Sequence, residues 1–98
     1  METAETGIDS KMVVFMSNVR NDPRIAPSHI SLFVAIIQYA KEHDIVNPLI
    51  IPKRELMNLA KISCEGTYHK NIRQLHEYGF IRYVPSFNRF EGSKIFLP

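Results

Sequence analysis

The 98-residue sequence contains a single cysteine, Cys64, and this scarcity limits the chemistry available to the chain. One thiol cannot form an internal disulfide and provides no cluster of thiolates for a metal ion. We therefore expect no covalent staples, and the cysteine content fits a reducing compartment.

Long apolar runs and a secretory leader are also missing. The longest uncharged apolar stretches, "ISLFVAIIQYA" and "MVVFM", fall well short of the ~18 consecutive apolar residues that indicate a membrane span. The first residues are acidic and polar, where a leader has positive charge followed by an apolar stretch. The sequence therefore predicts a cytoplasmic protein that does not bind a membrane.

Patterns that indicate catalysis or metal binding are absent as well. His29, His43, His69 and His76 include no pair at i, i+3 or i+4, so solvated or core histidines are favoured over metal ligands. Cys64 lies near His69, but no orienting acid accompanies the pair, and a buried turn cysteine is the favoured interpretation. There is no Gly-rich phosphate loop. We therefore expect that the protein is not an enzyme and that it binds neither a metal ion nor a cofactor.

Charge is unevenly distributed, although the formal net charge is only +2. Residues 1–52 carry four basic and six acidic side chains, whereas residues 53–98 carry eight basic and four acidic ones. The later half is therefore the basic one. Such asymmetry is compatible with an ordinary solvated face as well as with nucleic-acid binding. The choice between the two therefore depends on which residues lie on the predicted helices and strands.

The first half of the chain predicts two helices. Residues 1–9 show no periodic pattern, and we expect them to be disordered. Residues 10–21 have apolar side chains at helical spacing, although "MVVFM" is also compatible with a buried strand. The prolines of "NDPRIAP" end this segment, and Ser28 is placed to cap a core helix that runs to about His43.

The second half predicts a short strand, two helices and a hairpin. "NPLIIP" is too brief for a helix, and Lys53 to about Lys61 forms a short helix. Helix 65–78 follows the turn "ISCEG", with Tyr68, Ile72 and Leu75 on its inner face and Gly79 as a left-handed cap. "FIRYV" and "SKIFL" then pair across a turn as a two-stranded wing over residues 80–97.

Two helices separated by a tight turn and followed by a hairpin are typical of a winged helix-turn-helix. The fold class expected is thus mainly α with a small β-hairpin, in the order helix, helix, short strand, helix, helix, two-stranded wing. At this length residues 10–98 form a single domain.

The outer face of helix 65–78 carries side chains that can read base edges. Arg and Lys donate to guanine O6 and N7, Gln pairs with adenine, and Thr contacts a base edge or the thymine methyl. The predicted base contacts are Thr67, Lys70, Arg73 and Gln74. The alternative is an ordinary solvated helix face, on which Arg73 and Glu77 form an i, i+4 pair.

Basic and polar residues around this helix are placed to contact the DNA backbone, which gives affinity more than specificity. The predicted backbone contacts are Lys53, Arg54, His69, Arg82, Asn88, Arg89 and Lys94. Two alternatives remain. Phe87 and Phe90 can form an apolar cap over a hairpin whose charges only solubilise it, and Lys53 and Arg54 can be polar first-turn residues.

A palindromic DNA site requires a dimer, and segment 10–21 is the candidate dimer arm. Its apolar residues are Met12, Phe15, Met16 and Val19. The same residues can instead pack into the core against the central helix, and the sequence does not decide between the two.

The segments "PRIAPSHISLFVAIIQYA", "NPLIIPKRELMNLAKIS", "TYHKNIRQLHEYGFIRYVPSFN" and "GSKIF" resemble small winged-helix proteins of bacterial conjugative and mobilisable elements. More distantly, the chain is similar to the N-terminal winged-helix domain of plasmid replication initiators. The resemblance implies DNA binding in transcription control, replication or transfer of a mobile element, with Thr67, Tyr68, His69 and Lys70 at the reading helix. Glu91 in the wing departs from this pattern because it opposes a phosphate.

Three functions follow in order of preference. The first is a double-stranded DNA-binding transcriptional regulator or accessory factor, possible as a homodimer. The second is a protein-interaction module that uses the same fold, because a fold does not fix a function. A replication-initiation accessory protein is a further alternative.

Overall fold

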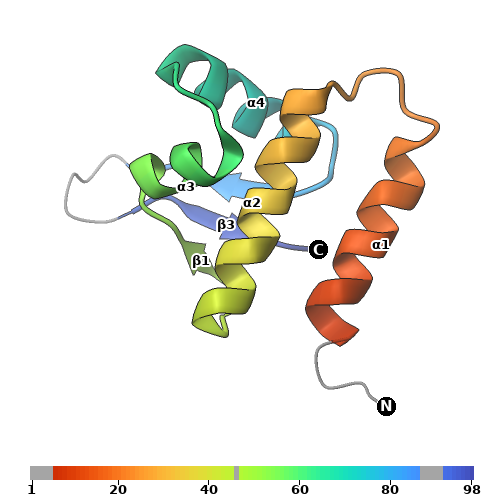
Figure 1. Ribbon diagram of the computed structural model, residues 1–98, viewed down its shortest axis with the longest axis horizontal. Helices are drawn as coiled ribbons and strands as arrows, with labels where there is room; N and C mark the ends of the chain where they lie inside the picture. Colours follow the sequence, from red (N-terminus) through yellow and green to blue (C-terminus); the bar gives the residue numbers. More distant parts are fainter. Residues whose placement is uncertain (1–5, 46, 87–91) are drawn as a thin grey trace.

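The computed structural model describes residues 6–45, 47–86 and 92–98. Its elements follow one another as α1 (Thr6–Val19), α2 (Pro27–His43), β1 (Leu49–Ile50), α3 (Lys53–Ala60), α4 (Glu65–Glu77), β2 (Arg82–Val84) and β3 (Lys94–Phe96) (Figure 1). The prediction of a mainly helical chain with a small antiparallel sheet is confirmed. No helix within the described ranges has the length and apolar character needed to cross a membrane.

Helix α1 begins at Thr6, so residues 6–9 are helical, whereas the sequence predicted disorder up to residue 9. The first turn is anchored because Ile8 packs against the core and the Asp9 carboxylate accepts a 3.0 Å hydrogen bond from Lys41 of α2. The sequence does not reveal these two contacts, because Ile8 is an isolated apolar residue in a polar stretch and Asp9 is distant in sequence from Lys41. Residues 1–5 lie outside the described ranges.

The inner face of α1 belongs to the core. The Phe15 ring stacks on Phe33 of α2 with centroids 3.8 Å apart and an interplanar angle of 3°, and it meets the Phe80 ring edge-on at 5.2 Å. Met12 and Val19 are half-buried against the same cluster. Of the predicted dimer-arm side chains these three therefore pack internally, and Met16 is the one that stays exposed.

Helix α2 is the centre of the fold, since it packs against α1, α3 and α4. Its N-cap is Ala26, two residues before the predicted Ser28, and Pro27 is the first helical residue. Proline suits that position because its missing N–H has no partner there in any helix. The Ala26 N–H donates to Nδ1 of His29 at 2.9 Å, which is the backward bond of a capping box, and alanine has no side-chain oxygen to act as the expected serine cap does.

The sheet has three strands in the order β1-β3-β2, so the predicted short strand joins the two predicted strands of the wing, a pairing that the sequence did not indicate. β3 pairs antiparallel with β2, as expected, and also with β1 through Leu49 opposite Ile95 and Ile50 opposite Lys94. The Asn47 side chain prolongs this ladder, because its amide donates to the Leu97 carbonyl (3.0 Å) and accepts from the Leu97 N–H (2.8 Å).

The register divides the sheet into two faces, because side chains alternate along each strand. Leu49, Ile95 and Tyr83 occupy one row across the three strands, where Leu49 and Ile95 are buried in the core. The next row, Ile50, Lys94 and Val84, lies on the opposite face and is exposed. The sheet therefore packs on the helices with one face only.

Replacing Phe15 by alanine tests the α1–α2 contact. Phe15 is 3% exposed and stacked on Phe33, so Phe15→Ala should lower the free energy of unfolding by about 3–5 kcal/mol. Val14→Ala is the matched control, because Val14 is 58% exposed on the same helix, and it should change this free energy by less than about 0.5 kcal/mol. Urea denaturation followed by circular dichroism measures both, and equal effects would contradict the packing described.

Candidate nucleic-acid interface

Helix α4 has an apolar inner face formed by the predicted residues Tyr68, Ile72 and Leu75, all buried. Burial raises the pKa of the Tyr68 phenol to about 12, with a smaller contribution from Tyr83. The helix ends at Glu77, and Gly79 has the left-handed φ of 87° that the sequence predicted for a C-terminal glycine. The chain then turns directly into the hairpin.

Two hydrogen bonds from the start of α2 fix the orientation of α4. The Ser28 hydroxyl donates to Oδ1 of Asn71 at 2.9 Å, and the Asn71 amide donates to the Thr67 carbonyl at 2.7 Å. One turn further along α4, His29 Nε2 lies 2.7 Å from Oε1 of Gln74. His29 and Asn71 are each only 4% exposed, so these polar contacts are part of the core.

The tautomer of His29 follows from its two partners. Nδ1 accepts the Ala26 N–H, so the proton of the neutral ring is on Nε2 and is donated to Gln74. One side chain thus caps α2 and binds α4. The sequence placed His29 among solvated or core histidines, and the structure confirms the core alternative. It did not anticipate Asn71, whose polar side chain lies on the otherwise apolar inner face.

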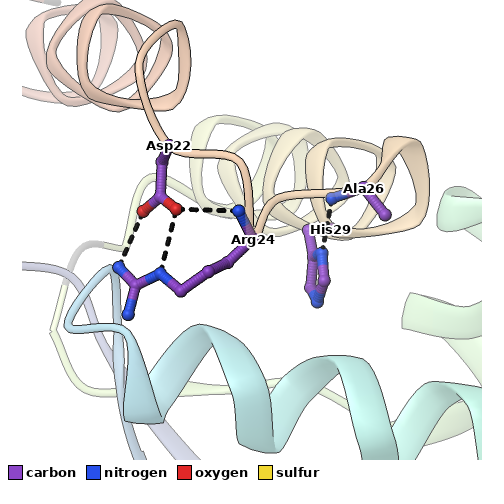
Figure 2. A network of polar contacts seen from close by, with 4 residues as sticks. All are labelled: Asp22, Arg24, Ala26 and His29. Carbon is purple, nitrogen blue, oxygen red and sulfur yellow. Dashed lines mark hydrogen bonds and ion pairs between the residues drawn. The ribbon is translucent and has the colours of Figure 1, made fainter.

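The loop before α2 holds the C-terminal end of α4 (Figure 2). The Asp22 carboxylate accepts from the Arg24 backbone N–H at 3.0 Å and from its guanidinium at 2.9 and 2.7 Å. The guanidinium carbon of Arg24 in turn lies 4.2 Å from the ring centroid of Tyr78, which is the C-cap residue of α4. The side-chain hydrogen bond from Arg24 lowers the pKa of Asp22 from 3.8 to about 2.

The outer face of α4 presents three of the four predicted base contacts. Thr67, Lys70 and Arg73 are exposed, and within the described ranges neither Lys70 nor Arg73 takes part in an ion pair. Gln74 differs from the prediction, because it is half-buried and its side-chain carbonyl is bonded to His29. Gln74 lies at the border between the inner and outer faces of α4, close enough to α2 for its side chain to reach His29.

A groove of about 570 Å³ runs between α4, the start of α3 and the hairpin. Its wall includes Lys53, Tyr68, His69, Arg73, Tyr83 and Ser93. The structure therefore brings together the predicted contacts Lys53, His69 and Arg73. Cationic or protonatable side chains surround a concavity that also has the hydroxyl groups of Tyr83 and Ser93, 3.3 Å apart.

Lys53 and Arg54 lie at the N-terminus of α3, beside this groove. Lys53 Nζ donates to Glu65 at the start of α4 at 3.0 Å, and this hydrogen bond lowers the pKa of Glu65. Lys53 thus compensates the one acidic group in the first turn of α4. Arg54 is exposed, and no ion pair involves it within the described ranges.

The predicted contacts of the hairpin are arranged differently. Arg82 and Lys94 are exposed on the sheet face turned away from α4, and the Arg82 guanidinium lies 4.6 Å from the ring centroid of Phe96. They therefore do not line the groove. Asn88 and Arg89, as well as Phe87, Phe90 and Glu91, lie outside the described ranges.

His76 joins α4 to the hairpin, a role that the sequence did not indicate. Its Nδ1 accepts the backbone N–H of Tyr83 at 3.0 Å, on the edge of β2 that does not pair with β3. This bond satisfies an edge N–H that is otherwise left for solvent or another chain. It also fixes the distance between the basic face of α4 and the hairpin.

Cys64 is exposed at the N-cap of α4, so the expectation of a buried turn cysteine was wrong. The side chain stays at the surface because the turn before α4 directs Ile62, rather than Cys64, into the core. Hydrogen bonds from the backbone N–H and the hydroxyl of Thr67, then from the Gly66 N–H, lower the pKa of its thiol. In the part of the chain that the structure describes, no group of three or more His, Cys, Asp or Glu side chains is arranged to hold a metal ion.

Comparison of the chain with protein-family models, curated proteins and solved structures finds no match. The family resemblance drawn from the sequence motifs therefore stays a prediction, and the argument for function depends on the geometry of α4 and its surroundings.

Asn71 provides a direct test of how α4 is held. Asn71→Ala removes a buried amide with two partners, so the free energy of unfolding should fall by about 1–3 kcal/mol. Asn58→Ala, at an exposed position of α3, is the matched control and should be nearly neutral. In a double-mutant cycle with Ser28→Ala, urea denaturation should give a coupling energy of about 0.5–1.5 kcal/mol. A coupling near zero would show that the Ser28–Asn71 bond contributes nothing.

The lowered pKa of Asp22 predicts that part of the free energy of unfolding is lost in acid. Its folded-state pKa lies below the unfolded value of 3.8, so its stabilising effect is complete above that pH and is lost as the pH falls toward about 2. Asp22→Asn should therefore lower the free energy of unfolding at about pH 5 and leave it unchanged relative to wild type near the acid end of this range. Denaturation curves at both pH values measure the difference, with Asp44→Asn as an exposed control. A deficit that is equal at both pH values would contradict the assigned Asp22–Arg24 interaction.

Proposed function

We propose that this protein is a DNA-binding protein of the winged helix-turn-helix class, in which α4 enters the major groove. The observation that carries the proposal is the exposed row of Thr67, Lys70 and Arg73 on a helix whose rotation is fixed from behind by α2. Within the described ranges, the two cations of this row are in no ion pair. A reading helix needs this rigidity, because a rotation about its axis moves each side chain to a different base edge.

The chemistry of the row suits base recognition. Arg73 and Lys70 can donate to guanine O6 and N7, and Thr67 can contact either a base edge or a thymine methyl near the N-terminus of α4. Gln74 is assigned a positioning role instead, because its carbonyl oxygen is held by His29 and is not available for a bidentate contact with adenine. The proposed base contacts are therefore Thr67, Lys70 and Arg73.

The groove beside α4 suits a phosphate strand. Lys53, His69 and Arg73 line it, so three side chains that carry or can gain positive charge flank the path of one backbone. Arg54 follows Lys53 in the first turn of α3 and is exposed. Phosphate approaching Lys53 competes with Glu65 for the ammonium group, which moderates its contribution. Contacts from Arg82 and Lys94 require DNA to reach the outer face of the sheet, and those from Asn88 and Arg89 rest on the sequence alone.

The biological role proposed is that of a transcriptional regulator or accessory factor of a mobile genetic element in the cytoplasm, with a replication-initiation accessory role as the alternative. This part rests on the motif resemblance. The geometry of α4 favours none of these roles over the others, because each requires the same contact with duplex DNA.

One observation favours a second candidate function, that of a protein-interaction module. Ile50, Lys94 and Val84 form a row across the outer face of the sheet, and Ile50 and Val84 are 50% and 37% exposed. Exposed apolar side chains that share one face of a sheet are typical of contact with a protein surface. This function predicts binding that survives substitution on α4 but is lost when Ile50 and Val84 are replaced.

The DNA proposal is tested by Lys70→Ala/Arg73→Ala. Fluorescence anisotropy with random-sequence duplex DNA should show binding by the wild type whose log K falls linearly with log salt. The double variant should bind about tenfold or more weakly at low salt, with a slope reduced by up to about 1.8, because on random-sequence DNA the two cations act mainly by neutralising nearby phosphates.

Lys11→Gln/Lys61→Asn is the charge-matched control, since it removes two positive charges outside α4 and the groove. It should retain most of the wild-type affinity. If the control weakens binding as much as the α4 variant, the attraction is a property of net charge and α4 is not the reader. If the wild type does not bind at low salt, the DNA proposal fails and the sheet face becomes the preferred site.

A further inference from the structure

The outward side of α1 carries a stripe of side chains that the core does not use. Asp9, Val13, Met16 and Arg20 are separated by four, three and four residues, so at ~100° per residue they lie within roughly 60° of one another. Val13 is 65% and Met16 41% exposed. Arg20 follows the last residue of α1, but its N–H donates to the Met16 carbonyl and so continues the helical turn.

Helix α2 widens the stripe into a patch. The two helices lie side by side and run in opposite directions (Figure 1). Their alignment is set by the Asp9–Lys41 ion pair near one end and the Phe15–Phe33 stack in the middle. This alignment places Val34, which is 44% exposed, at the level of Met16. An apolar centre is thus bounded by Asp9 and Lys41 at one end and Arg20 at the other.

The order of charge and apolar side chains in the stripe is self-complementary. The midpoint between positions 9 and 20 is also the midpoint between 13 and 16, so a two-fold axis through that point relates α1 to an antiparallel copy of itself. Asp9 then faces Arg20 of the second copy at both ends, and Val13 faces Met16 of the second copy on either side of the axis. A two-fold interface requires this kind of matching, because the same patch must fit itself.

We propose that this stripe is a homodimer interface, in which α1 of one chain packs antiparallel on α1 of a second copy, with Val34 at the edge of the contact. The charges support this occupant over an unrelated partner. Within the described ranges Arg20 has no ion-pair partner, and the Asp9 carboxylate, half-exposed beside Lys41, retains acceptor capacity. In the proposed dimer, Arg20 of each chain pairs with Asp9 of the other chain.

The opposite flank of α1 does not have this property and serves as a built-in comparison. Val14 is 58% exposed there, lining a cavity of about 460 Å³ with Ser10, Lys11, Phe15 and Phe80. Lys11 donates to the Pro98 carbonyl, so the one charged side chain on this flank is already engaged. Since α1 packs chiefly on α2, the proposed dimer leaves α4 uncovered and does not depend on DNA binding.

The first experiment compares two neighbouring valines by sedimentation velocity of the full chain over a concentration series. The wild type should dimerise, and Val13→Lys should raise the dimer dissociation constant by about tenfold or more because it buries a charge in the apolar centre. Val14→Lys, with similar exposure on the other flank, should change it by less than about threefold. A wild type that remains monomeric at all concentrations up to about 100 μM, or equal effects of the two substitutions, would overturn the proposal.

A charge exchange tests the antiparallel register. Arg20→Glu makes both ends of the stripe acidic and Asp9→Lys makes both ends basic, so each variant alone should dimerise less tightly than the wild type. A mixture of the two should form heterodimers more tightly than either variant forms homodimers, because every facing pair is then opposite in charge. Circular dichroism checks that both variants keep their helical content, since Asp9→Lys also loses the bond to Lys41. A mixture that associates no better than its components would reject the register.

Discussion

The arrangement of the protein depends on the two partly buried hydrogen bonds between the start of α2 and α4, Ser28 to Asn71 and His29 to Gln74. Tyr68, Ile72 and Leu75 supply the apolar area that holds α4 to the core, but apolar contacts have little directional preference. Hydrogen bonds do have one, and leaving either partner unpaired in the core is costly. They therefore select one rotation of α4 and, with it, which side chains face outward. The exposed row of Thr67, Lys70 and Arg73 is the consequence of contacts on the other side of the helix.

The same histidine links this constraint to the neighbouring elements. His29 can bind Gln74 only while its ring is oriented by the Ala26 N–H, so the start of α2 and the position of α4 are set together. The His29 and Tyr78 rings also meet at an interplanar angle of 62°, and Tyr78 in turn contacts the Arg24 guanidinium held by Asp22. At the far side of α4, His76 binds the Tyr83 N–H and sets the position of the hairpin. The groove is consequently built from elements with fixed relative positions, as a surface that must match a rigid duplex requires.

The sequence predicted those parts of the fold that depend on local periodicity, and it failed where two distant segments meet. The apolar spacing of Tyr68, Ile72 and Leu75 and the glycine at 79 locate α4 because both signals lie within one helix. The pairing of Leu49 with Ile95 is invisible to such signals, because two-residue β1 carries no information on its partner. Gln74 and Arg82 are predicted DNA contacts chosen by residue type, which carries no information on their surroundings: His29 holds the first, and strand alternation places the second on the outer face. For segment 10–21 the sequence left core packing and a dimer arm open for a similar reason: helical spacing groups Met12, Phe15 and Val19 correctly, but only the position of α2 shows that their side packs into the core.

The uneven charge of the chain acquires a physical meaning once the two surfaces are compared. On α4 and the start of α3 the exposed basic side chains Lys53, Arg54, Lys70 and Arg73 only slightly outnumber Glu55, Glu65 and Glu77, but the charged side chains among the described residues that line the groove, Lys53 and Arg73, are both basic. Such a surface suits a partner that is itself uniformly charged, as a phosphate backbone is. On α1 the charges alternate in sign about a two-fold point, with Asp9 at one end and Arg20 at the other, so a second copy is attracted and a uniformly charged polymer is not. The two proposed surfaces therefore favour different partners, and one chain can bind a copy of itself through α1 while α4 stays available to a polyanion.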